Sequence, residues 1–254
     1  MLEDNKSYLK DLNEAQLNAV LKTDGPSMVI AGAGSGKTRV LTYKIVHLVE
    51  NGVDPFEILA LTFTNKAARE MKLRISSMIG ESESKNIWMG TFHSVFAKIL
   101  RFEAHKIGFT SDFTIYDTQD SERLISSIIK EKALDKDVYR PKSIRNRISS
   151  LKNNFITVNG YFANNELVES DNLSRKPETG NIYKEYSERL IKSNSMDFDD
   201  LLMKTNELLN NHPEVLAKYQ EKFKYILVDE YQDTNNSQYL ICLLYTSPSP
   251  RDWT

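Results

Sequence analysis

The sequence predicts an α/β fold in which a parallel sheet carries a phosphate-binding loop and an all-helical subdomain is inserted into the chain. Over about the first hundred residues, short apolar segments alternate with amphipathic helical patterns, which is typical of a parallel sheet with helices on both faces. A glycine-rich loop, AGAGSGKT, follows the first apolar segment. A last buried-strand pattern, YILVDE at 225–230, returns only after a long helical stretch, which indicates the insertion.

The individual elements follow from the residue patterns in chain order. The expected strands are the apolar segments 27–31, 58–63, 87–90 and 225–229. The expected helices between the strands are 36–52, 65–79 with Gly80 as its C-cap, and 92–105. From 118 to about 195 the pattern is mostly helical, and further helices are expected at 198–209 and 213–222.

The composition bounds the class of protein. The chain has 254 residues, 40% of them hydrophobic and 27% charged, with a net charge of −2, so a nucleic acid would have to bind at a local basic patch. No apolar run approaches the roughly 20 residues of a membrane helix, and the N-terminal segment lacks the apolar core of a signal peptide. A single cysteine, Cys242, excludes an intramolecular disulfide. We expect a cytoplasmic protein that does not bind membranes.

The loop at 31–38 has the composition and the strand–loop–helix surroundings of a Walker A motif. Its glycines let backbone N–H groups turn toward phosphate oxygens, Lys37 can reach the β- and γ-phosphates, and the Thr38 hydroxyl can ligate Mg²⁺. Alanine stands at position 31, where the strict pattern has glycine, and a plain glycine-rich turn is the alternative. The expected nucleotide-binding residues of the loop are Ala31, Gly32, Ala33, Gly34, Ser35, Gly36, Lys37 and Thr38.

Two acids follow the last expected strand, at the edge where α/β sheets place their ligands. Asp229 is expected to hold Mg²⁺ together with Thr38, and Glu230 to polarise the attacking water, so that Lys37 and this acid pair form the expected catalytic set. A guanine-specific site is not indicated, because the nearest match to an Asn-Lys-x-Asp base reader, at 65–68, lacks the aspartate. The two motifs together predict a nucleoside triphosphatase.

Six segments occur in an order that one protein family shares. They are LNEAQLNAV (12–20), AGAGSGKTRVLT (31–42), LALTFTNKAAREMKLRI (59–75), GTFHSVFAKILR (90–101), MDFDDLL (196–202) and ILVDEYQDTNNSQY (226–239). Over residues 1 to about 241 the sequence resembles the UvrD/Rep/PcrA-type superfamily 1 DNA helicases. The resemblance implies an ATP-dependent DNA helicase that moves 3′ to 5′ and uses ATP and Mg²⁺.

The resemblance also implies roles for residues outside the loop. Gln16 matches the residue that reads adenine, since a glutamine amide offers both a donor and an acceptor, and Arg39 matches the residue that packs near the base and sugar. Gln232 and Asp233 match the residues that link the nucleotide state to the DNA contacts. The residues that match the family's contacts with single-stranded DNA are Phe63, Thr64, Asn65, Thr91 and His93.

By the same resemblance, residues 1–110 and 196–241 form a RecA-like ATP-binding domain, and residues 111–195 form an inserted helical subdomain that lies beside the duplex junction. The second RecA-like domain of the family, which supplies arginine fingers to the ATP cleft, is expected to be missing. We therefore expect the full-length parent to unwind DNA and this fragment to be inactive.

Two charged clusters have a structural and a functional interpretation. The acid pair Asp199 and Asp200 is interpreted as structural, because carboxylates at a helix start favour the helix dipole. The second cluster is either a phosphate-contacting face or a solvated helix, and the solvated helix is favoured here. Its members are Arg140, Lys142, Arg145, Arg147 and Lys152.

The end of the chain departs from the family pattern. Residues 242–254 are expected to be a non-native tail, because the string from Cys242 to Asp252 is what results from translating a transposase adapter used in sequencing libraries. The strand that RecA-like domains insert beside the loop-bearing strand would then be absent. We expect segments 27–31 and 225–229 either to be unpaired across a slot about 10 Å wide or to pair directly, in a marginally stable, aggregation-prone chain.

Two alternatives to a helicase fragment stay open at this stage. The chain could belong to a non-motor ATP-dependent DNA-binding module or to the helicase subunit of a recombination nuclease. Stimulation of ATP hydrolysis by single-stranded DNA would favour a motor, and binding without turnover would favour a module.

Overall fold

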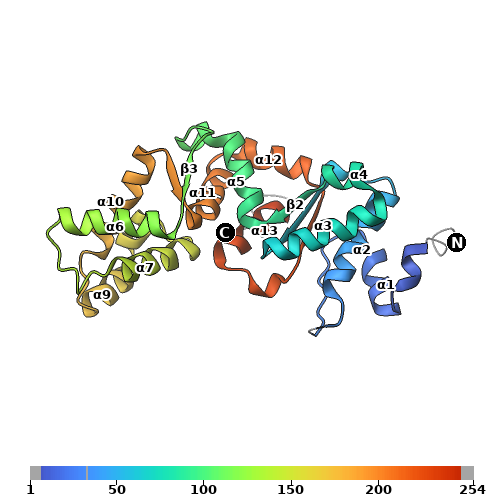
Figure 1. Ribbon diagram of the computed structural model, residues 1–254, viewed down its shortest axis with the longest axis horizontal. Coiled ribbons are helices and arrows are strands. Elements are labelled where there is room, and N and C mark those ends of the chain that lie inside the picture. The colour runs from blue at the N-terminus through green and yellow to red at the C-terminus, as the bar shows by residue number, and fades with distance from the viewer. Residues whose placement is uncertain (1–6, 33, 247–254) are drawn as a thin grey trace. The chain divides into compact units, whose positions relative to one another are not determined.

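The computed structural model describes residues 7–32 and 34–246 and divides into two compact units (Figure 1). The first unit comprises Met1–Val95 and Lys218–Asp233, and the second comprises Phe96–Ala217 and Thr234–Thr254. Each unit is described by itself. The expected boundary between a RecA-like domain and an inserted subdomain, at 110/111 and 195/196, stays a prediction.

The first unit is built on a parallel sheet of three strands in the order β2-β1-β5. These strands are β1 (Ile58–Thr62), β2 (Trp88–Thr91) and β5 (Tyr225–Val228). The register pairs Leu59 of β1 with Trp88 on one side and with Ile226 on the other. All five residues of β1 are buried, as expected for a central strand of apolar residues. The parallel sheet and three of its predicted strands are therefore confirmed.

Helices flank this sheet, and most begin and end where their capping residues predict. They are α1 (Glu14–Leu21), α2 (Lys37–Glu50), α3 (Asn65–Ile79) and α4 (Glu81–Asn86), with the short 3₁₀ turns η1 (Ser7–Asp11), η2 (Pro55–Glu57) and η4 (Tyr231–Asp233). Helix α3 packs on β1 and β2. Its start is capped by the Thr64 side chain, which accepts a hydrogen bond from the Ala67 N–H, and its end by Gly80.

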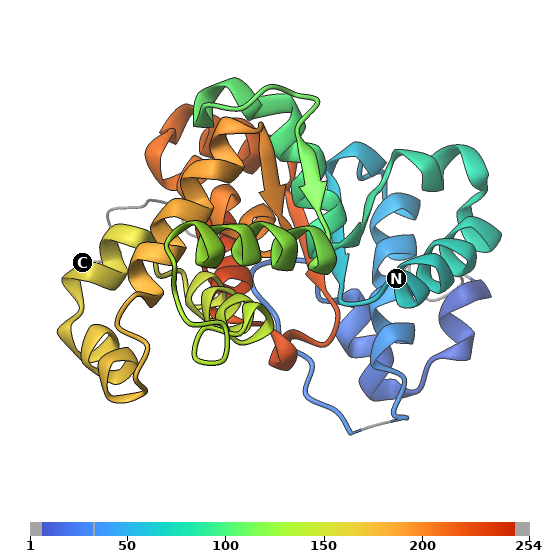
Figure 2. The same ribbon diagram turned by 60° about the vertical axis from the view of Figure 1, so that its left-hand side comes forward.

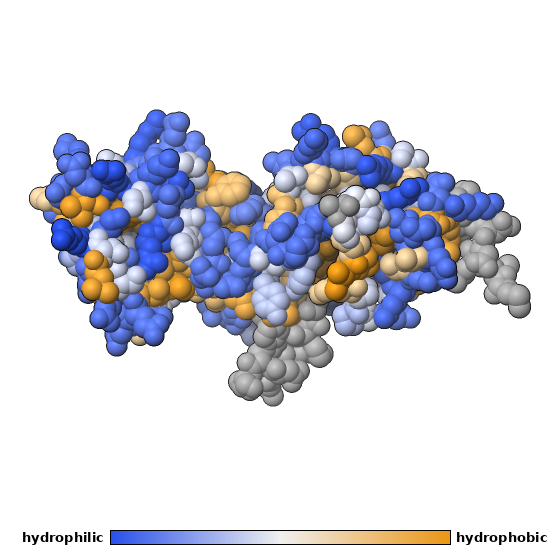
Figure 3. Space-filling model, turned by 90° about the horizontal axis from the view of Figure 1, so that it is seen from below, coloured by the Kyte–Doolittle hydropathy of each residue, from blue (hydrophilic) through white to orange (hydrophobic). Residues whose placement is uncertain are grey.

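The segment 27–31 does not form the predicted buried strand. No strand is assigned there, and the residues Met28, Val29 and Ile30 are 70%, 44% and 90% exposed. The apolar run had indicated burial, but a strand also needs a neighbour that completes its hydrogen bonds. Among the described residues β5 pairs with β1 alone, so the unpaired alternative is the one observed. Other apolar side chains also interrupt the largely hydrophilic surface seen in Figure 3.

The second unit is mainly helical and includes the whole of the predicted insertion. Helices α6 to α10, green to orange in Figure 2, are grouped around a shared apolar core that includes Ile125, Ile128, Ile148, Tyr183 and Leu190. The helices that lie within this unit are α6 (Thr118–Glu131), α7 (Pro141–Asn153), α8 (Val158–Ala163), α9 (Asn165–Leu173), α10 (Thr179–Lys192), α11 (Phe198–Asn211) and α13 (Asn236–Thr246), with the 3₁₀ turn η3 (Ala104–Ile107). Helices α5 (Phe92–Glu103) and α12 (Pro213–Lys222) each begin in one unit and end in the other.

A second, two-stranded parallel sheet was not predicted. It pairs β3 (Thr114–Tyr116) with β4 (Ser195–Asp197) in the second unit. Strands of three residues are too short to show a periodicity of their own, so the sequence gives no signal for them.

Two findings concern the chain as a whole. The first finding concerns the helices: among the residues that the structure describes, no helix is long and apolar enough to cross a membrane. The second finding concerns the single cysteine. Cys242 is buried within α13, and its burial raises the pKa of the thiol to about 12. The remaining predicted tail, 247–254, lies outside the described residues.

Candidate functional site

The parallel strands of the first unit bring distant polar residues to one edge of the sheet. Thr62 of β1 pairs with Thr91 of β2, and Leu61 of β1 pairs with Val228 of β5. The Asp229 N–H continues this ladder by donating to the Leu61 carbonyl at 2.9 Å. The predicted acid pair therefore begins at the carboxyl end of the sheet, beside the residues that follow β1.

The glycine-rich loop is shaped by two left-handed residues. Gly34 has φ 77° and Gly36 has φ 89°, values that favour glycine, and Gly36 is the N-cap of α2. The left-handed backbone at Gly36 disfavours a larger residue, and a Cβ atom there would lie 2.8 Å from Gln16 Nε2 and so displace the Gln16 amide. Ser35 closes the turn by donating its hydroxyl to the Gly32 carbonyl at 2.6 Å. Ala33 lies outside the described residues.

The lysine of the loop points back over the loop itself. Lys37 Nζ donates to the carbonyl oxygens of Ala31 at 3.1 Å and Gly32 at 3.4 Å, and lies 3.9 Å from Glu230 Oε2. Its side chain is 23% exposed and that of Glu230 is 39% exposed. An ammonium group held by neutral carbonyls is available to a stronger acceptor, because charge-assisted hydrogen bonds are roughly twice as strong as neutral ones.

The two predicted magnesium ligands meet directly. The Thr38 hydroxyl donates to Asp229 Oδ2 at 3.2 Å, across 191 positions of sequence. Burial raises the pKa of the Asp229 carboxyl above its usual value, and the Thr38 hydrogen bond opposes that shift. The described residues contain no group of three or more His, Cys, Asp or Glu that could hold a metal by themselves. A hydroxyl and a carboxylate nevertheless fit Mg²⁺, which binds few protein oxygens and completes its shell with water and phosphate.

The second acid occupies a strained position. Glu230 has φ 49°, which is uncommon for a residue with a side chain and costs of order 1–3 kcal/mol. Three hydrogen bonds hold this turn: its N–H donates to Asp229 Oδ1 at 3.1 Å, its carbonyl accepts from the Asp233 N–H at 2.9 Å, and its carboxylate accepts from Gln232 Nε2 at 2.6 Å. The conformation sets the Glu230 carboxylate beside Lys37.

The residues expected to contact the base are linked to the loop. Gln16 Oε1 accepts from the Asn13 N–H at 3.2 Å, completing a capping box at the start of α1, while its Nε2 donates to the Ser35 carbonyl at 3.0 Å. Arg39 lies over the ring of Tyr43 at 5.3 Å and 3.9 Å from Asp11 Oδ2. Both predicted residues therefore lie at the loop or at the helix that follows it.

Sequence reasoning missed part of the surroundings of Arg39. Besides this arginine, a hollow of the first unit is lined by Tyr8, Asp11, Tyr43 and Arg74, together with Ser77 and Met78. The four-residue spacing of Arg39 and Tyr43 on α2 was the available signal, because such residues share one helix face. Burial, aided by the charge of Glu50, raises the pKa of the Tyr8 hydroxyl to about 12.

The residues predicted to contact DNA divide into exposed and packed ones. Thr64 and Asn65, at the start of α3, are exposed. Phe63 is half-buried, with its ring 5.7 Å from that of Phe92. Thr91 is buried, and its hydroxyl accepts from the Ser94 N–H at 3.2 Å.

His93 follows β2 and lies partly buried at the start of α5. Burial lowers the pKa of its imidazole to about 4, so the ring is neutral at neutral pH. A neutral ring can donate one hydrogen bond to a nucleic acid but brings no positive charge.

Three cations of the basic stretch around α7 are paired with carboxylates. Lys152 is 1% exposed, and its ammonium group lies 2.7 Å from Asp197 Oδ2 and 2.8 Å from Asp200 Oδ1. Burial acts to lower the pKa of Lys152, but these carboxylates outweigh burial and raise it. Arg145 pairs with Glu122 and Arg147 with Asp171. Within this stretch, Arg140 and Lys142 are exposed.

The acid pair at the start of α11 has the structural role expected of it. Asp200 forms a capping box with Asp197, whose side chain accepts from the Asp200 N–H at 2.8 Å. Burial and the neighbouring Asp197 raise the pKa of the Asp200 carboxyl to about 6. Asp199 accepts a hydrogen bond from Asn153 Nδ2 at 2.9 Å.

A parallel sheet, a loop with left-handed glycines and an acid pair facing its lysine and threonine define a nucleotide-binding α/β domain of the P-loop class. The chain belongs to the UvrD/REP helicase N-terminal domain family, which matches residues 12–249.

Individual relatives of the chain are named as DNA helicases. The chain is 46% identical to the ATP-dependent DNA helicase PcrA of Bacillus subtilis over 240 residues, which cover 92% of this chain and 31% of that protein. It is 44% identical to the PcrA helicase of Leuconostoc citreum, with 94% and 31% covered, and 44% identical to that of Staphylococcus aureus, with 95% and 32% covered. The chain thus spans about a third of the length of these relatives.

Proposed function

We propose that the chain is the ATP-binding part of an ATP-dependent DNA helicase that moves 3′ to 5′ along single-stranded DNA. One observation carries the proposal: the loop and the acid pair meet, with Thr38 3.2 Å from Asp229 and Lys37 3.9 Å from Glu230. A separation of 191 positions means that folding, and not chain proximity, creates this meeting. Membership of the UvrD/REP helicase N-terminal domain family supports a helicase as the protein that uses this site.

The residues divide the chemistry between them. Lys37 exchanges its backbone carbonyls for the β- and γ-phosphate oxygens of ATP, which bind an ammonium group more strongly. Thr38 and Asp229 would hold Mg²⁺, which would supply positive charge beside the phosphates. Glu230 orients the attacking water and accepts its proton. Gln16 and Arg39 provide the base and sugar contacts.

Single-stranded DNA is proposed to cross the carboxyl ends of β1 and β2. Thr64 and Asn65 are exposed there and Phe63 is partly exposed, so two polar residues and part of an aromatic residue are available to a strand. Stacking on such a ring contributes about 1–3 kcal/mol per base and tolerates any sequence, which suits a motor. Thr91 and His93, at the carboxyl end of β2, would contact the backbone of the same DNA strand.

In the complete protein, residues 1–110 and 196–241 form a RecA-like domain with 111–195 as its helical insertion. A second RecA-like domain supplies arginine fingers and completes the motor, which acts at the junction of single-stranded and duplex DNA in the cytoplasm. The relatives are about three times as long as this chain and are named ATP-dependent DNA helicases, which supports this arrangement.

Nucleotide binding by residues 1–254 tests the site. A fluorescent ATP analogue is expected to bind in the presence of Mg²⁺, and Lys37→Ala is expected to weaken binding at least tenfold, because a charge-assisted contact is lost. Lys142→Ala, a change to an exposed lysine of α7, is the matched control. Equal affinity for the wild type and Lys37→Ala would refute the assignment of the loop.

Strand separation by the complete protein tests the motor. We expect ATP hydrolysis stimulated by single-stranded DNA and unwinding of duplexes that carry a 3′ tail but not of those with a 5′ tail. Glu230→Gln is expected to retain ATP binding and lose turnover. Tight DNA binding without stimulated hydrolysis would instead identify a non-motor module.

A further inference from the structure

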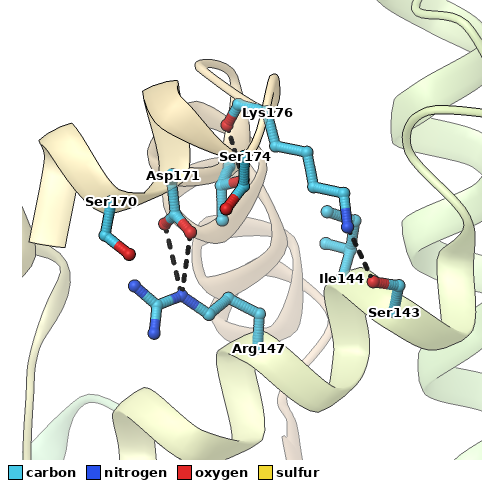
Figure 4. A pocket seen from close by; sticks show the side chains of 8 residues that line it. Ser143, Ile144, Arg147, Ser170, Asp171, Ser174 and Lys176 are labelled. Carbon is cyan, nitrogen blue, oxygen red and sulfur yellow. Dashed lines mark hydrogen bonds and ion pairs between the residues drawn. The ribbon is translucent and has the colours of Figure 1, made fainter.

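The second unit has a polar hollow that the proposed ATP and DNA contacts do not use. It lies between the first turns of α7, the end of α9 and the turn that leads into α10, as Figure 4 shows. Its lining includes two cationic side chains, one carboxylate and several hydroxyl groups. The polar residues that matter here are Ser143, Arg147, Ser170, Asp171, Ser174 and Lys176.

Not all N–H donors of Arg147 are paired. Its Nε donates to Asp171 Oδ1 at 3.1 Å and Oδ2 at 3.3 Å, whereas its Nη2 is buried and has no hydrogen-bond partner. A guanidinium group has five N–H donors, and leaving a buried one unpaired costs free energy. The terminal nitrogens lie on the same side of Asp171 as the Ser170 hydroxyl (Figure 4). The Arg147 side chain as a whole is 29% exposed, so its accessible N–H groups, rather than the enclosed Nη2, can bind an oxygen-rich ligand on this side.

Lys176 is the second cation of the hollow. Its Nζ donates to the Ser143 hydroxyl at 2.9 Å, and within the described part of the chain it forms no ion pair. Asp171 cannot neutralise both cations, because it carries one negative charge and already pairs with Arg147; it also accepts from the Tyr161 hydroxyl at 2.8 Å. The hollow therefore has two cations and one carboxylate, which favours an anion.

The size and the donor geometry narrow the ligand to one small group. The hollow has a volume of about 260 Å³, below the roughly 300–1,000 Å³ of pockets that enclose whole small molecules. The donors come from different elements: the guanidinium from α7, the ammonium from the turn before α10, and exposed hydroxyls of Ser170 and Ser174 from α9 and its end. Donors on several sides suit a tetrahedral oxyanion better than a planar carboxylate.

We propose that this hollow binds a single phosphate group, with Arg147 and Lys176 as its charged contacts. The group is either free phosphate or one phosphodiester of a DNA backbone, and only the second source rests on the proposed function. Ser170 and Ser174 add hydroxyl donors at the rim.

Titration with inorganic phosphate tests the site. The titration uses the full chain with Lys37→Ala, so that the glycine-rich loop does not compete, and follows the ³¹P signal by NMR. We expect saturable broadening, and an affinity about tenfold weaker with Lys176→Gln added, because one charge-assisted contact is lost. Arg147→Lys, which keeps a charge beside Asp171 but removes the guanidinium fork, is expected to weaken binding similarly. Lys142→Gln, an exposed change on the same helix, should leave it unchanged.

Thermal melting of each variant accompanies the titration, so that loss of binding is not confused with loss of folding. Ser170→Ala, at an exposed position, provides a variant that leaves the Arg147–Asp171 pair intact and should weaken phosphate binding about twofold to tenfold. The proposal is overturned if Lys176→Gln and Lys142→Gln bind inorganic phosphate equally, or if no saturable binding occurs.

Duplex DNA binding across a range of salt concentrations distinguishes the two sources. If the phosphate belongs to a DNA backbone, Lys176→Gln should reduce the slope of log affinity against log salt by about 0.9, and Lys142→Gln should not. An unchanged slope together with lost inorganic phosphate binding identifies free phosphate as the ligand. Absence of any DNA binding by the wild-type chain would count against the proposed function, while the ³¹P titration would still decide the site.

Discussion

Lys152 in the second unit is buried between the carboxylates of Asp197 and Asp200, at 2.7 and 2.8 Å, whereas Lys37 in the first unit is held by two backbone carbonyls. The first lysine is 1% exposed and the second 23%. A lysine whose charge is matched by fixed carboxylates serves the fold, because any ligand would have to break a buried ion pair. A lysine whose nearest partners are neutral carbonyls, with a partly exposed carboxylate 3.9 Å away, can serve a ligand. The partners and burial of a lysine therefore distinguish a structural from a functional role better than the residue type does.

The largest expected effect is on stability and separates the two lysines. Lys152→Met should lower the free energy of unfolding by about 3–5 kcal/mol, because it leaves two buried carboxylates without their cation. Lys37→Met should change it by less than about 1 kcal/mol, since the lost contacts are partly exposed. Urea denaturation of the two variants measures the difference. Equal losses would contradict the division between structural and functional lysines.

The pH dependence of stability should come partly from the first unit. The folded-state pKa of His93, about 4, lies below its ordinary value of 6.5, so the unfolded state binds more protons between these pH values. The stability that the neutral ring contributes is present above pH 6.5 and is lost as the pH falls toward 4, by up to about 3 kcal/mol. Denaturation of the wild type and His93→Gln at several pH values checks this. Parallel curves for the two proteins would exclude a buried neutral histidine.

The loop glycines should differ in their tolerance of a side chain. Gly36→Ala should cost roughly 1–3 kcal/mol, because alanine at φ 89° is strained and its Cβ would lie 2.8 Å from Gln16 Nε2. Gly32→Ala should cost less than about 0.5 kcal/mol, because a Cβ there meets nothing within 4 Å and no left-handed backbone is required. Thermal unfolding of both variants compares them, and a larger loss for Gly32→Ala would contradict the loop geometry.

The smallest effect on folding stability is expected at the unpaired apolar segment. Ile30 is 90% exposed, so Ile30→Lys should alter the free energy of unfolding by no more than about 0.5 kcal/mol. The same change should reduce aggregation, because a charge in an exposed apolar segment opposes association between chains. Light scattering during incubation at 37 °C measures this. Unchanged aggregation would show that another surface is responsible.

Much of the first unit could be predicted because local signals and tertiary context agree there. Helix α3 has the predicted bounds, with Thr64 capping its start and Gly80 its end. In the second unit, α12 likewise begins at the predicted Pro213. The Walker A loop and the acid pair were predicted because phosphate chemistry restricts residue type and spacing. Their meeting at Thr38 and Asp229 follows from the parallel order of the strands.

The errors arise where pairing partners lie far away in the sequence. Segment 27–31 has a strand pattern, but a pattern does not state whether a neighbouring strand is present. Lys152 lies in a basic helical stretch that indicated solvent, and the carboxylates that pair with it come from the end of β4 and the start of α11, 45 or more positions later. The strands β3 and β4 are held together by backbone hydrogen bonds, which side-chain periodicity does not reveal.

The double attachment of Gln16 has a consequence for recognition. Its amide bridges the Asn13 N–H at the start of α1 and the Ser35 carbonyl beside the phosphate loop, yet Nε2 keeps a second hydrogen and Oε1 a second lone pair. A purine edge can therefore add to the bridge without breaking it. In the proposed nucleotide complex, a base bound to Gln16 would restrain the turn expected to contact the triphosphate, so that one side chain would couple the base site to the phosphate site.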